Sequence, residues 1–317
     1  MKILVTGGAG FIGSNLTEEL VLQGHQVRIL DNFITGRRDN LEPFSDKVEV
    51  IEGDIRSPFL CLKACRGMDA VVHLAALNRA PRSLIDPEAF FDVNERGTIN
   101  MLMAASECGV EKLLIASSSS VYGDHGPLAT PEDHQKAPTS PYGVSKMNAE
   151  AACKVLVETC NIKLVQMLRF FSVFGPKQLA NGETCAAIPK LIRAAWKGIP
   201  FPVYGDGFQT RDFTYVGNVV SSIIEILNWS EWPNQFEIMN IAEGFPVSIN
   251  SLITEVQKYF NPKIKIGYQS ARAGDFKHSL SDPSNMRTGV KSSFLPFQEG
   301  LSKTVSWYLN NRERLDV

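Results

Sequence analysis

The pattern with the most direct chemical use in this sequence is Tyr142 followed four residues later by Lys146. That spacing places both side chains on one face of a helix, and Pro141 suits the first position of such a helix. A free phenol has a pKa of about 10 and is a poor base at neutral pH. A neighbouring ammonium favours the phenolate and lowers that pKa. The pair therefore predicts a base able to take a proton from a hydroxyl group.

A run of four serines, Ser117 to Ser120, supplies hydroxyls that could assist such a base. It follows directly on an apolar stretch, Lys112–Ala116, which has the composition of a strand. A hydroxyl at the carboxyl end of a sheet strand could meet the same substrate oxygen as the phenol, and Ser118 is the candidate. The alternative interpretation is a flexible serine-rich turn.

Glycines near the start of the chain follow the spacing of a dinucleotide site. The strand-like run Ile3–Val5 leads into a turn with Gly7, Gly10 and Gly13, and an amphipathic stretch follows. In this pattern the three glycines permit, in order, the tight turn, the approach of backbone to a pyrophosphate, and close packing of helix on strand. The helix amino end then presents free N–H groups to phosphate.

The acidic residue that accompanies such a loop is Asp31, at the end of the strand predicted over Gln26–Leu30. A carboxylate there binds both ribose hydroxyls and repels a 2′-phosphate, so NAD is favoured over NADP. Arg37 and Arg38 lie nearby and weaken that preference. A nicotinamide cation would further favour the Tyr142 phenolate.

Short apolar runs alternate with helical patterns through the first half of the chain, which predicts an α/β fold with a doubly wound parallel sheet (Rossmann). Such sheets bind ligands beyond the carboxyl ends of their strands. The predicted strands and helices are Ile3–Val5, Gln26–Leu30, Val48–Ile51, Ala70–His73, Lys112–Ala116, Ser14–Gln23 and Ile99–Cys108.

The pattern changes after Gly175, where a second, smaller mixed α/β lobe is predicted. We expect residues 1–175, with 211–245 returning, to form the NAD-binding domain. Residues 176–210 and 246–317 would form the substrate lobe, with the substrate in the cleft between. The elements predicted here are the helices Ala187–Trp196, Asn218–Leu227 and Ile249–Tyr259, and the strands Arg211–Val216 and Ile238–Ile241.

Composition argues against several classes of protein. The 317 residues carry 32 basic and 34 acidic side chains, a net charge of -2, so nucleic acid and anionic membranes are not expected partners. The opening run is a strand leading into a glycine turn and not an export signal. The six cysteines form no C-x-x-C pair, which predicts reduced thiols in a cytoplasmic protein and no metal site.

Taken together, these motifs resemble the extended short-chain dehydrogenase/reductase family, in its NAD-dependent nucleotide-sugar epimerase and dehydratase branch. The resemblance covers essentially the whole chain and is most like UDP-glucose and UDP-N-acetylglucosamine 4-epimerases. The matching segments are T-G-G-A-G-F-I-G from Thr6, D-N-F-I-T-G from Asp31, G-D-I from Gly53, H-L-A-A from His73, S-S-S-S-V-Y-G from Ser117, P-Y-G-V-S-K from Pro141, L-R-F-F-S-V-F-G-P from Leu168, G-D-G-F-Q-T-R-D-F from Gly205 and R-A-G-D from Arg272.

The resemblance implies a role for many single residues. Ser118, Tyr142 and Lys146 would be catalytic, while His73 is a strand-end residue without a chemical role. Residues implied in cofactor binding are Gly7, Gly10, Phe11, Ile12, Gly13, Asp31, Asn32, Gly36, Asp54, Ile55, Leu74, Ala75, Ala76, Asn94, Tyr142, Lys146 and Phe171. Residues implied in substrate binding are Asn78, Ser83, Ser118, Ser172, Arg211, Arg272, Asp275 and Ser279.

Within that branch, the residues beside the catalytic hydroxyl favour an epimerase. Dehydratases carry an Asp-Glu pair there and decarboxylases commonly a Glu, whereas this chain has Ser119 and Ser120. The expected reaction oxidises C4 of a UDP-sugar to a ketone and reduces it from the opposite face. The small Ser279 leaves room for an N-acetyl group, which predicts that UDP-GlcNAc and UDP-GalNAc are accepted as well as UDP-glucose and UDP-galactose.

Other assignments stay open at this point. Ser172, Asn78 and Asn218 depart from residues common in UDP-hexose epimerases, and a small hydroxyl residue at 172 also suits a UDP-glucuronate 4-epimerase. A UDP-sugar dehydratase or decarboxylase and, more remotely, a non-catalytic NAD-binding protein are the alternatives. The resemblance also implies a homodimer built from the helix after Tyr142 and the helix Ile99–Cys108.

Overall fold

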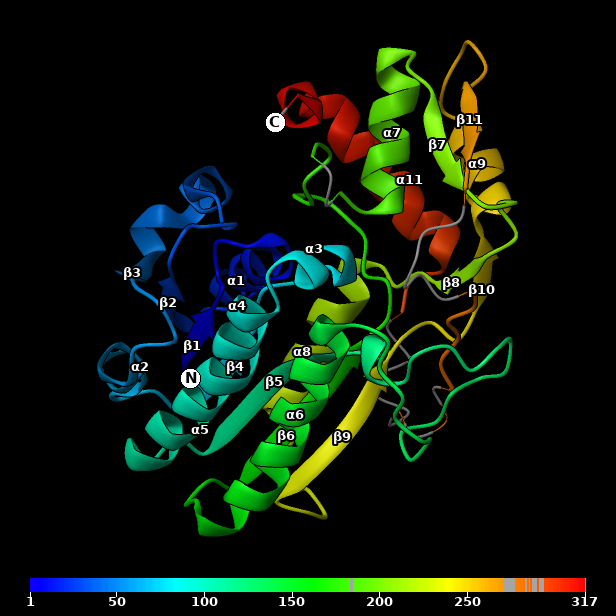
Figure 1. Ribbon diagram of the computed structural model, residues 1–317. Helices are drawn as coiled ribbons and strands as arrows, with labels where there is room; N and C mark the ends of the chain where they lie inside the picture. The colour runs from blue at the N-terminus through cyan, green and yellow to red at the C-terminus, as the bar shows by residue number, and fades with distance from the viewer. Residues whose placement is uncertain are drawn as a thin grey trace.

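A seven-stranded parallel sheet forms the centre of the computed structural model (Figure 1), which describes residues 1–182, 185–270, 277–282, 284, 286, 290 and 294–316. The strand order is β3-β2-β1-β4-β5-β6-β9. The strands are β1 (Lys2–Thr6), β2 (Gln26–Asp31), β3 (Val48–Glu52), β4 (Ala70–His73), β5 (Lys112–Ser118), β6 (Leu164–Phe170) and β9 (Phe236–Ile241).

Helices cover both faces of this sheet, and the alternation of side chains in β1 shows why. Ile3 and Val5 are fully buried in the core shared with α1 and α8, whereas Leu4 is fully buried in the core shared with α2, α5 and α6. Because neither face meets water, the central strands are apolar at successive positions. The helices are α1 (Phe11–Leu22), α8 (Val216–Asn228), α2 (Pro58–Cys65), α5 (Gly97–Glu107) and α6 (Pro141–Leu156).

The doubly wound fold is confirmed, and the five strands predicted in the first half all form within two residues of their predicted ends. The sequence reading missed β6, although this strand is buried throughout. Gln166 and Arg169 interrupt its apolar run, so the sequence does not show the continuous apolar pattern of a buried strand. The strand predicted over Arg211–Val216 is wrong beyond Asp212, because residue 213 onward leaves the ladder and α8 begins at Val216.

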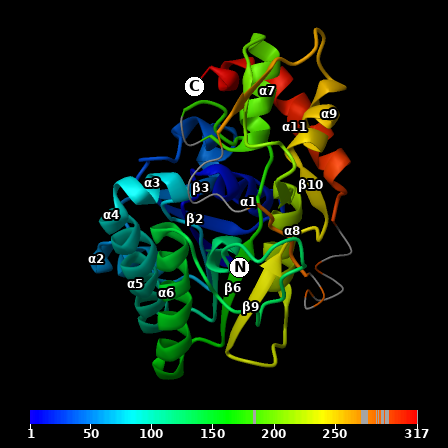
Figure 2. The same cartoon turned by 45° about the vertical axis from the view of Figure 1, so that its right-hand side comes forward.

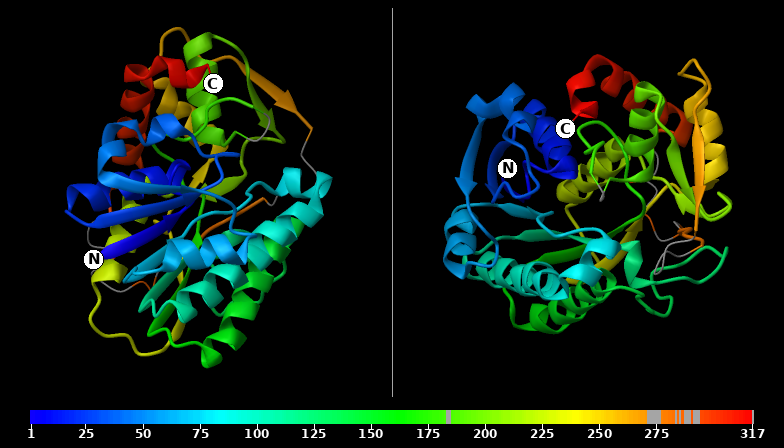
Figure 3. Two further views of the ribbon diagram at one scale, coloured as in Figure 1. Left: turned by 90° about the vertical axis from the view of Figure 1, so that its left-hand side faces the viewer. Right: turned by 45° about the horizontal axis from the view of Figure 1, so that its top comes forward.

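The second half of the chain adds a smaller group of elements above the sheet (Figures 2 and 3). Two small sheets belong to it, one pairing β8 with β10 and one pairing β7 with β11. Its elements are α7 (Ala187–Lys197), β7 (Phe201–Tyr204), β8 (Thr210–Asp212), β10 (Pro246–Ser248), α9 (Ile249–Gln257), β11 (Ile266–Gln269) and α11 (Phe297–Asn310).

Residues 211–245, which were predicted to return to the NAD-binding domain, divide between the large sheet and the smaller group of elements. β9 joins the large sheet beside β6, while Arg211 and Asp212 pair with β10. The domain limits at residues 175, 210 and 245 stay a prediction. Within the described part of the chain, no helix combines the length and hydrophobicity needed to cross a membrane.

Candidate functional site

The glycine turn after β1 is packed too closely for side chains. Gly7 has φ +68°, and a Cβ there would lie 2.8 Å from the backbone nitrogen of Ala75. A Cβ on Gly13 would collide with the carbonyl oxygen of Gly7, whereas Gly10 meets only that oxygen, at 3.1 Å. The outer side of the turn is therefore open at the amino end of α1, which begins at Phe11. This cradle fits the pyrophosphate of a dinucleotide.

The Asp31 carboxylate lies beside this turn at the end of β2. It accepts hydrogen bonds from the backbone N–H groups of Ala9 and Phe33, both at 2.9 Å. Burial raises the pKa of Asp31, and these two bonds oppose that shift. A Cβ on Gly36 would lie 2.8 Å from the same carboxylate, so that glycine keeps the surroundings of Asp31 open.

The two arginines near Asp31 are held by other carboxylates. Arg37 pairs with Asp39 at 2.7 Å and Arg38 with Glu52 at 2.5 Å. With those partners in place, neither guanidinium is committed to a 2′-phosphate, and Asp31 remains the predicted determinant of the ribose preference.

The predicted adenine side is an ordered polar cluster. Asn32 donates to Asp54 at 2.9 Å, and Arg56 donates to both oxygens of that carboxylate. The Arg56 hydrogen bonds lower the pKa of Asp54 to about 2. Ile55 is buried, with its side chain against Gly97.

His73 is a structural residue at the end of β4. Its Nδ1 lies 2.7 Å from the Thr6 hydroxyl, which accepts from the N–H of Ala75, and its Nε2 lies 3.1 Å from the Thr98 hydroxyl, which donates to Asn94 O. The hydroxyl protons are thereby assigned, so the ring carries its proton on Nε2. Burial lowers the pKa of His73 to about 3, which keeps it neutral.

Asn94 connects the loop after β4 to α6. Its amide exchanges two hydrogen bonds with the backbone of Leu77, at 2.8 and 2.9 Å, and donates to the Ser145 hydroxyl at 3.1 Å. The residue is fully buried within a π-helical turn, Asp92–Arg96. The predicted cofactor residues Leu74, Ala75 and Ala76 are partly exposed on the loop that Asn94 fixes.

The Ser118 and Tyr142 hydroxyls come together from the end of β5 and the first turn of α6. Ser118 lies close enough to the phenol to act on its pKa, and the Ser118 hydroxyl donates to the Ser120 hydroxyl at 3.1 Å. Ser140 caps α6 by accepting from Gly143 N at 3.2 Å, which fixes the turn that carries the phenol. The structure thus brings together the two hydroxyls that the sequence predicted would share one substrate oxygen.

The electrostatics of Tyr142 differ from the prediction. Burial raises the pKa of the phenol, while the Ser118 hydrogen bond and the positive charge of Arg79 act in the opposite direction. Lys146 lies one turn along α6, but its ammonium donates to the carbonyl of Ala116 at 2.8 Å. The prediction of a phenol pKa lowered by Lys146 is wrong, because burial dominates and the nearby cation is Arg79.

A buried ion pair fixes α6 against β5 and β6. Arg169 donates to both oxygens of Glu150, at 2.8 and 2.7 Å, and Ser117 donates to the same carboxylate at 2.6 Å. Both charged side chains are almost completely shielded from water. The sequence reading missed this pair, which positions the catalytic helix beside the serine run.

Phe171, predicted at the nicotinamide side, is almost wholly buried. It packs on Tyr122, with ring centroids 6.1 Å apart, in a small core that includes Val121 and Ala242. Any contribution of Phe171 to the cofactor site is therefore as support for the neighbouring backbone.

Two of the predicted substrate residues line a cavity of about 280 Å³ between the two parts of the structure. Ser172, with φ +29°, and Arg211 both line it. Ser279 donates its backbone N–H to Thr210 O, and so lies next to Arg211. Arg272 and Asp275 lie outside the described residues.

Two further residues, Asn78 and Ser83, were predicted to bind substrate but do not line this cavity. Asn78 is exposed to solvent on the loop after β4. Ser83 is fully buried in α3 (Ala80–Ile85), where its hydroxyl donates to Ala80 O and accepts from the N–H of Tyr142 at 3.1 Å. Ser83 therefore positions the phenol.

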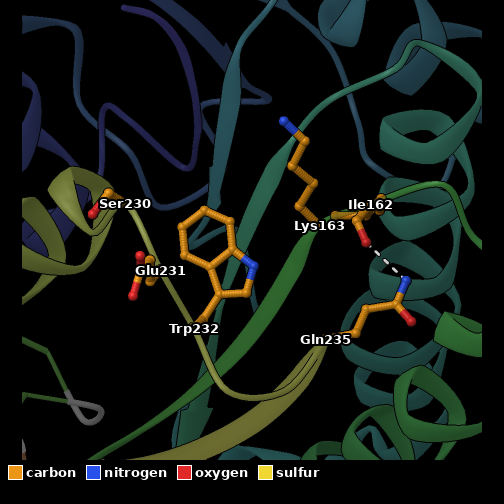
Figure 4. Close-up of a pocket in the computed structure, with 6 residues that line it drawn as sticks. All are labelled: Ile162, Lys163, Ser230, Glu231, Trp232 and Gln235. Carbon is orange, nitrogen blue, oxygen red and sulfur yellow. Dashed lines mark hydrogen bonds between the residues drawn. The ribbon is translucent and has the colours of Figure 1, made fainter.

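A second hollow lies at the other end of the sheet (Figure 4). It is lined by residues before β6 and β9, among them Ile162 and Trp232, and Gln235 donates to Ile162 O at 2.8 Å. Because open parallel sheets bind ligands at the carboxyl ends of their strands, this amino-end hollow is not the candidate site.

Comparison with known proteins agrees with this geometry. The model of the "NAD dependent epimerase/dehydratase family" matches residues 3–242. A putative UDP-glucose 4-epimerase of Methanocaldococcus jannaschii is 34% identical over 98% of this chain and 99% of its own.

Solved structures give the same result. A UDP-N-acetylglucosamine 4-epimerase from Methanobrevibacter ruminantium, in complex with UDP-N-acetylmuramic acid, is 33% identical with a TM-score of 0.89 and 98% of each chain covered. A UDP-glucuronic acid 4-epimerase from Bacillus cereus, in complex with UDP-glucuronic acid and NAD, is 29% identical with a TM-score of 0.90, covering 98% of this chain and 100% of its own.

Proposed function

This chain belongs to the NAD-dependent epimerase/dehydratase family, and on that premise we propose that it inverts C4 of a UDP-linked sugar through a 4-keto intermediate. The observation that carries the proposal is the contact between the Ser118 and Tyr142 hydroxyls at the carboxyl end of β5. Ser119 and Ser120 follow, so these two positions do not supply the acid–base pair that elimination would need, while Ser118 and Tyr142 suit proton transfer at one oxygen.

The family is NAD-dependent, and the residues of this chain fit NAD. The turn with Gly7, Gly10 and Gly13 would hold the pyrophosphate, and Asp31 would bind the ribose hydroxyls. When bound, NAD supplies a reversible acceptor for the hydride of the sugar C4. Tyr142 lies on α6, which packs against β5 of the same sheet.

Tyr142 would transfer the proton of the C4 hydroxyl, and Ser118 would hydrogen-bond the oxygen that loses it. Arg79, and the positive nicotinamide ring that NAD would supply, oppose the effect of burial and favour the Tyr142 phenolate. As phenolate, Tyr142 takes the proton of the C4 hydroxyl, while the Ser118 hydroxyl donates a hydrogen bond to the same oxygen and stabilises its developing charge. The same phenol returns the proton when the ketone is reduced. Turning the keto sugar about its diphosphate bond between these events presents the opposite face and inverts C4.

The size of the residue at 279 supports an N-acetylhexosamine as one accepted sugar. Ser279 is bonded to Thr210 beside Arg211, the candidate diphosphate ligand. A side chain of this size next to Arg211 would leave room for a 2-acetamido group. A relative in this fold, the Methanobrevibacter enzyme, is described as a UDP-N-acetylglucosamine 4-epimerase.

The decisive experiment incubates the purified protein with single UDP-sugars and identifies products by NMR and mass spectrometry. Epimerisation conserves mass, whereas a dehydratase product loses water and a decarboxylase product loses CO₂. Tyr142→Phe should lower kcat by about 10²- to 10⁴-fold while the protein stays folded. Tyr259→Phe, which alters a tyrosine on the surface, is the matched control. Wild-type turnover by Tyr142→Phe would overturn the proposal.

We also propose a homodimer in the cytoplasm. Met103 on α5 and Val155 on α6 expose 47% and 70% of their surface, and the two helices pack side by side, so they offer an apolar face to a second copy. All six cysteines are free, which suits a reducing compartment. Sedimentation of Val155→Glu beside the wild type tests the dimer.

A further inference from the structure

Arg79 is a charged residue in the candidate site to which the proposed mechanism assigns no contact with substrate. It follows β4 and precedes α3, and its backbone has φ +90° and ψ +106°. Side chains other than glycine rarely adopt this conformation, and such positions cluster where function requires them. Ser172, which lines the same cavity, also has a positive φ.

Hydrogen bonds fix Arg79 relative to the catalytic phenol. Its carbonyl oxygen accepts from the N–H of Ser83 at 3.2 Å, and the Ser83 hydroxyl accepts from the N–H of Tyr142 at 3.1 Å. α3 and α6 pack against each other in the same region (Figure 2). The guanidinium is close enough to Tyr142 for their charges to interact.

The Arg79 guanidinium has no hydrogen bond or ion pair among the residues that the structure describes. Other arginines in this fold are treated differently: Arg169 is held by Glu150 and Arg37 by Asp39. Burial disfavours the charged form of Arg79 and lowers its pKa. A partly buried cation without a paired anion costs free energy that a bound anion would offset.

The charged residues that line the cavity indicate which kind of anion it would bind. Arg79, Lys190 and Arg211 line it, and within the described chain no carboxylate does. A sugar diphosphate brings two negative charges, and Arg211 belongs to that end of the site. Arg79 is instead near Tyr142, which the proposed function places at C4.

We propose that Arg79 binds a carboxylate carried next to C4 of the sugar, so that acidic UDP-sugars are the preferred substrates. This inference rests on the proposed function, because it takes Tyr142 to mark the position of C4. The carbons adjacent to C4 are C3 and C5. The carboxylate is therefore either that of a hexuronate, bonded to C5, or that of an acidic ether on the C3 oxygen.

The test compares acidic and neutral sugars that are otherwise matched. The pairs are UDP-glucuronate with UDP-glucose, and UDP-GlcNAc with its 3-O-lactyl derivative. In the wild type kcat/KM should favour one acidic member, and that member identifies the carbon that carries the carboxylate. Arg79→Gln should lower the acidic-to-neutral ratio of kcat/KM for that pair by about 10- to 100-fold, the range for a charged hydrogen bond. Arg82→Gln, which changes an exposed arginine on α3, three residues further along the chain, should leave the ratio unchanged.

Binding measured without turnover separates the two proposals. In the NAD-loaded Tyr142→Phe protein, calorimetry should show tighter binding of the acidic sugar, and adding Arg79→Gln should remove that preference. Equal ratios in wild type and Arg79→Gln, with neutral sugars turned over, would overturn the role of Arg79 and leave the epimerase intact. Absence of turnover with every UDP-sugar, together with normal binding, would overturn the proposed function and not the carboxylate site.

Discussion

The ammonium of Lys146 donates a hydrogen bond to the carbonyl of Ala116, 2.8 Å away, and so ties α6 to the end of β5. Ala116 lies two residues before Ser118, and Lys146 lies one turn after Tyr142. Together with the bonds of Glu150 to Ser117 and Arg169, this bond fixes the strand that carries Ser118 relative to the helix that carries Tyr142. It also holds the positive charge of Lys146 close to the end of β5.

The pH dependence of the reaction should report this ammonium. Burial lowers the pKa of Lys146 to about 8, and Glu150 opposes the shift. Because a lysine loses its charge as the pH rises through its pKa, kcat should fall above about pH 8. Lys146→Met should lower kcat by about 10²- to 10⁴-fold and abolish this alkaline fall. A pH profile of the variant that parallels the wild type would contradict the assignment.

The ribose preference should depend on the charge of Asp31. Asp31→Asn keeps the shape of the side chain but removes the repulsion of a 2′-phosphate, so NAD should bind about 10- to 100-fold more weakly and NADP more tightly. Fluorescence titration with both dinucleotides measures the exchange. Asp39→Asn frees Arg37 and leaves Asp31 intact. If that control gained NADP affinity while Asp31→Asn did not, Arg37 and not Asp31 would decide the preference.

The sequence allowed the cofactor half of this site to be predicted because its determinants are local. The glycine turn, Asp31 and the first turn of α6 are each set by residues within one strand–turn–helix unit. The two candidate hydroxyls could also be predicted, since Ser118 ends the strand β5 and Tyr142 lies in the first turn of the helix α6.

Contacts between distant segments could not be predicted in this way. Arg169 reads as a break in an apolar strand, and only the fold brings it to Glu150 across 19 positions of sequence. Arg79 carries no motif, and its positive φ and its approach to Tyr142 depend on α3 docking against α6. The phenol pKa was predicted from a spacing of four residues, whereas burial in the folded chain determines its direction.

The buried pair of Glu150 and Arg169 should dominate the response of stability to mutation. Glu150→Gln leaves Arg169 buried without a compensating charge, so the free energy of unfolding should fall by about 3–5 kcal/mol. Glu158→Gln, which changes an exposed residue after the same helix, should have little effect. Urea unfolding at pH 7 measures both, and a loss below about 1 kcal/mol for Glu150→Gln would contradict the prediction.

The same pair should also make the free energy of unfolding depend on pH in acid. The Arg169 hydrogen bonds lower the pKa of Glu150 below its ordinary value of 4.5, against the effect of burial. A lowered pKa stabilises the fold above the unfolded-state pKa, and this contribution is lost as the pH falls through the folded-state value. The difference in unfolding free energy between wild type and Glu150→Gln should therefore shrink below about pH 4.5. A constant difference down to pH 3 would contradict this linkage.

The width of the cavity beside Ser279 should decide whether the sugar may carry an N-acetyl group. Ser279 is tied through its backbone to Thr210, next to Arg211 of the cavity lining, so we expect a larger side chain at this position to narrow this side of the site. Ser279→Tyr should lower kcat/KM for UDP-GlcNAc at least 10-fold more than for UDP-glucose, because a bulky group that blocks a substituent penalises only the sugar that carries it. Ser230→Tyr adds the same side chain in the hollow at the opposite end of the sheet and should change neither sugar. Equal losses for both sugars in Ser279→Tyr would show that the acetamido group lies elsewhere in the site.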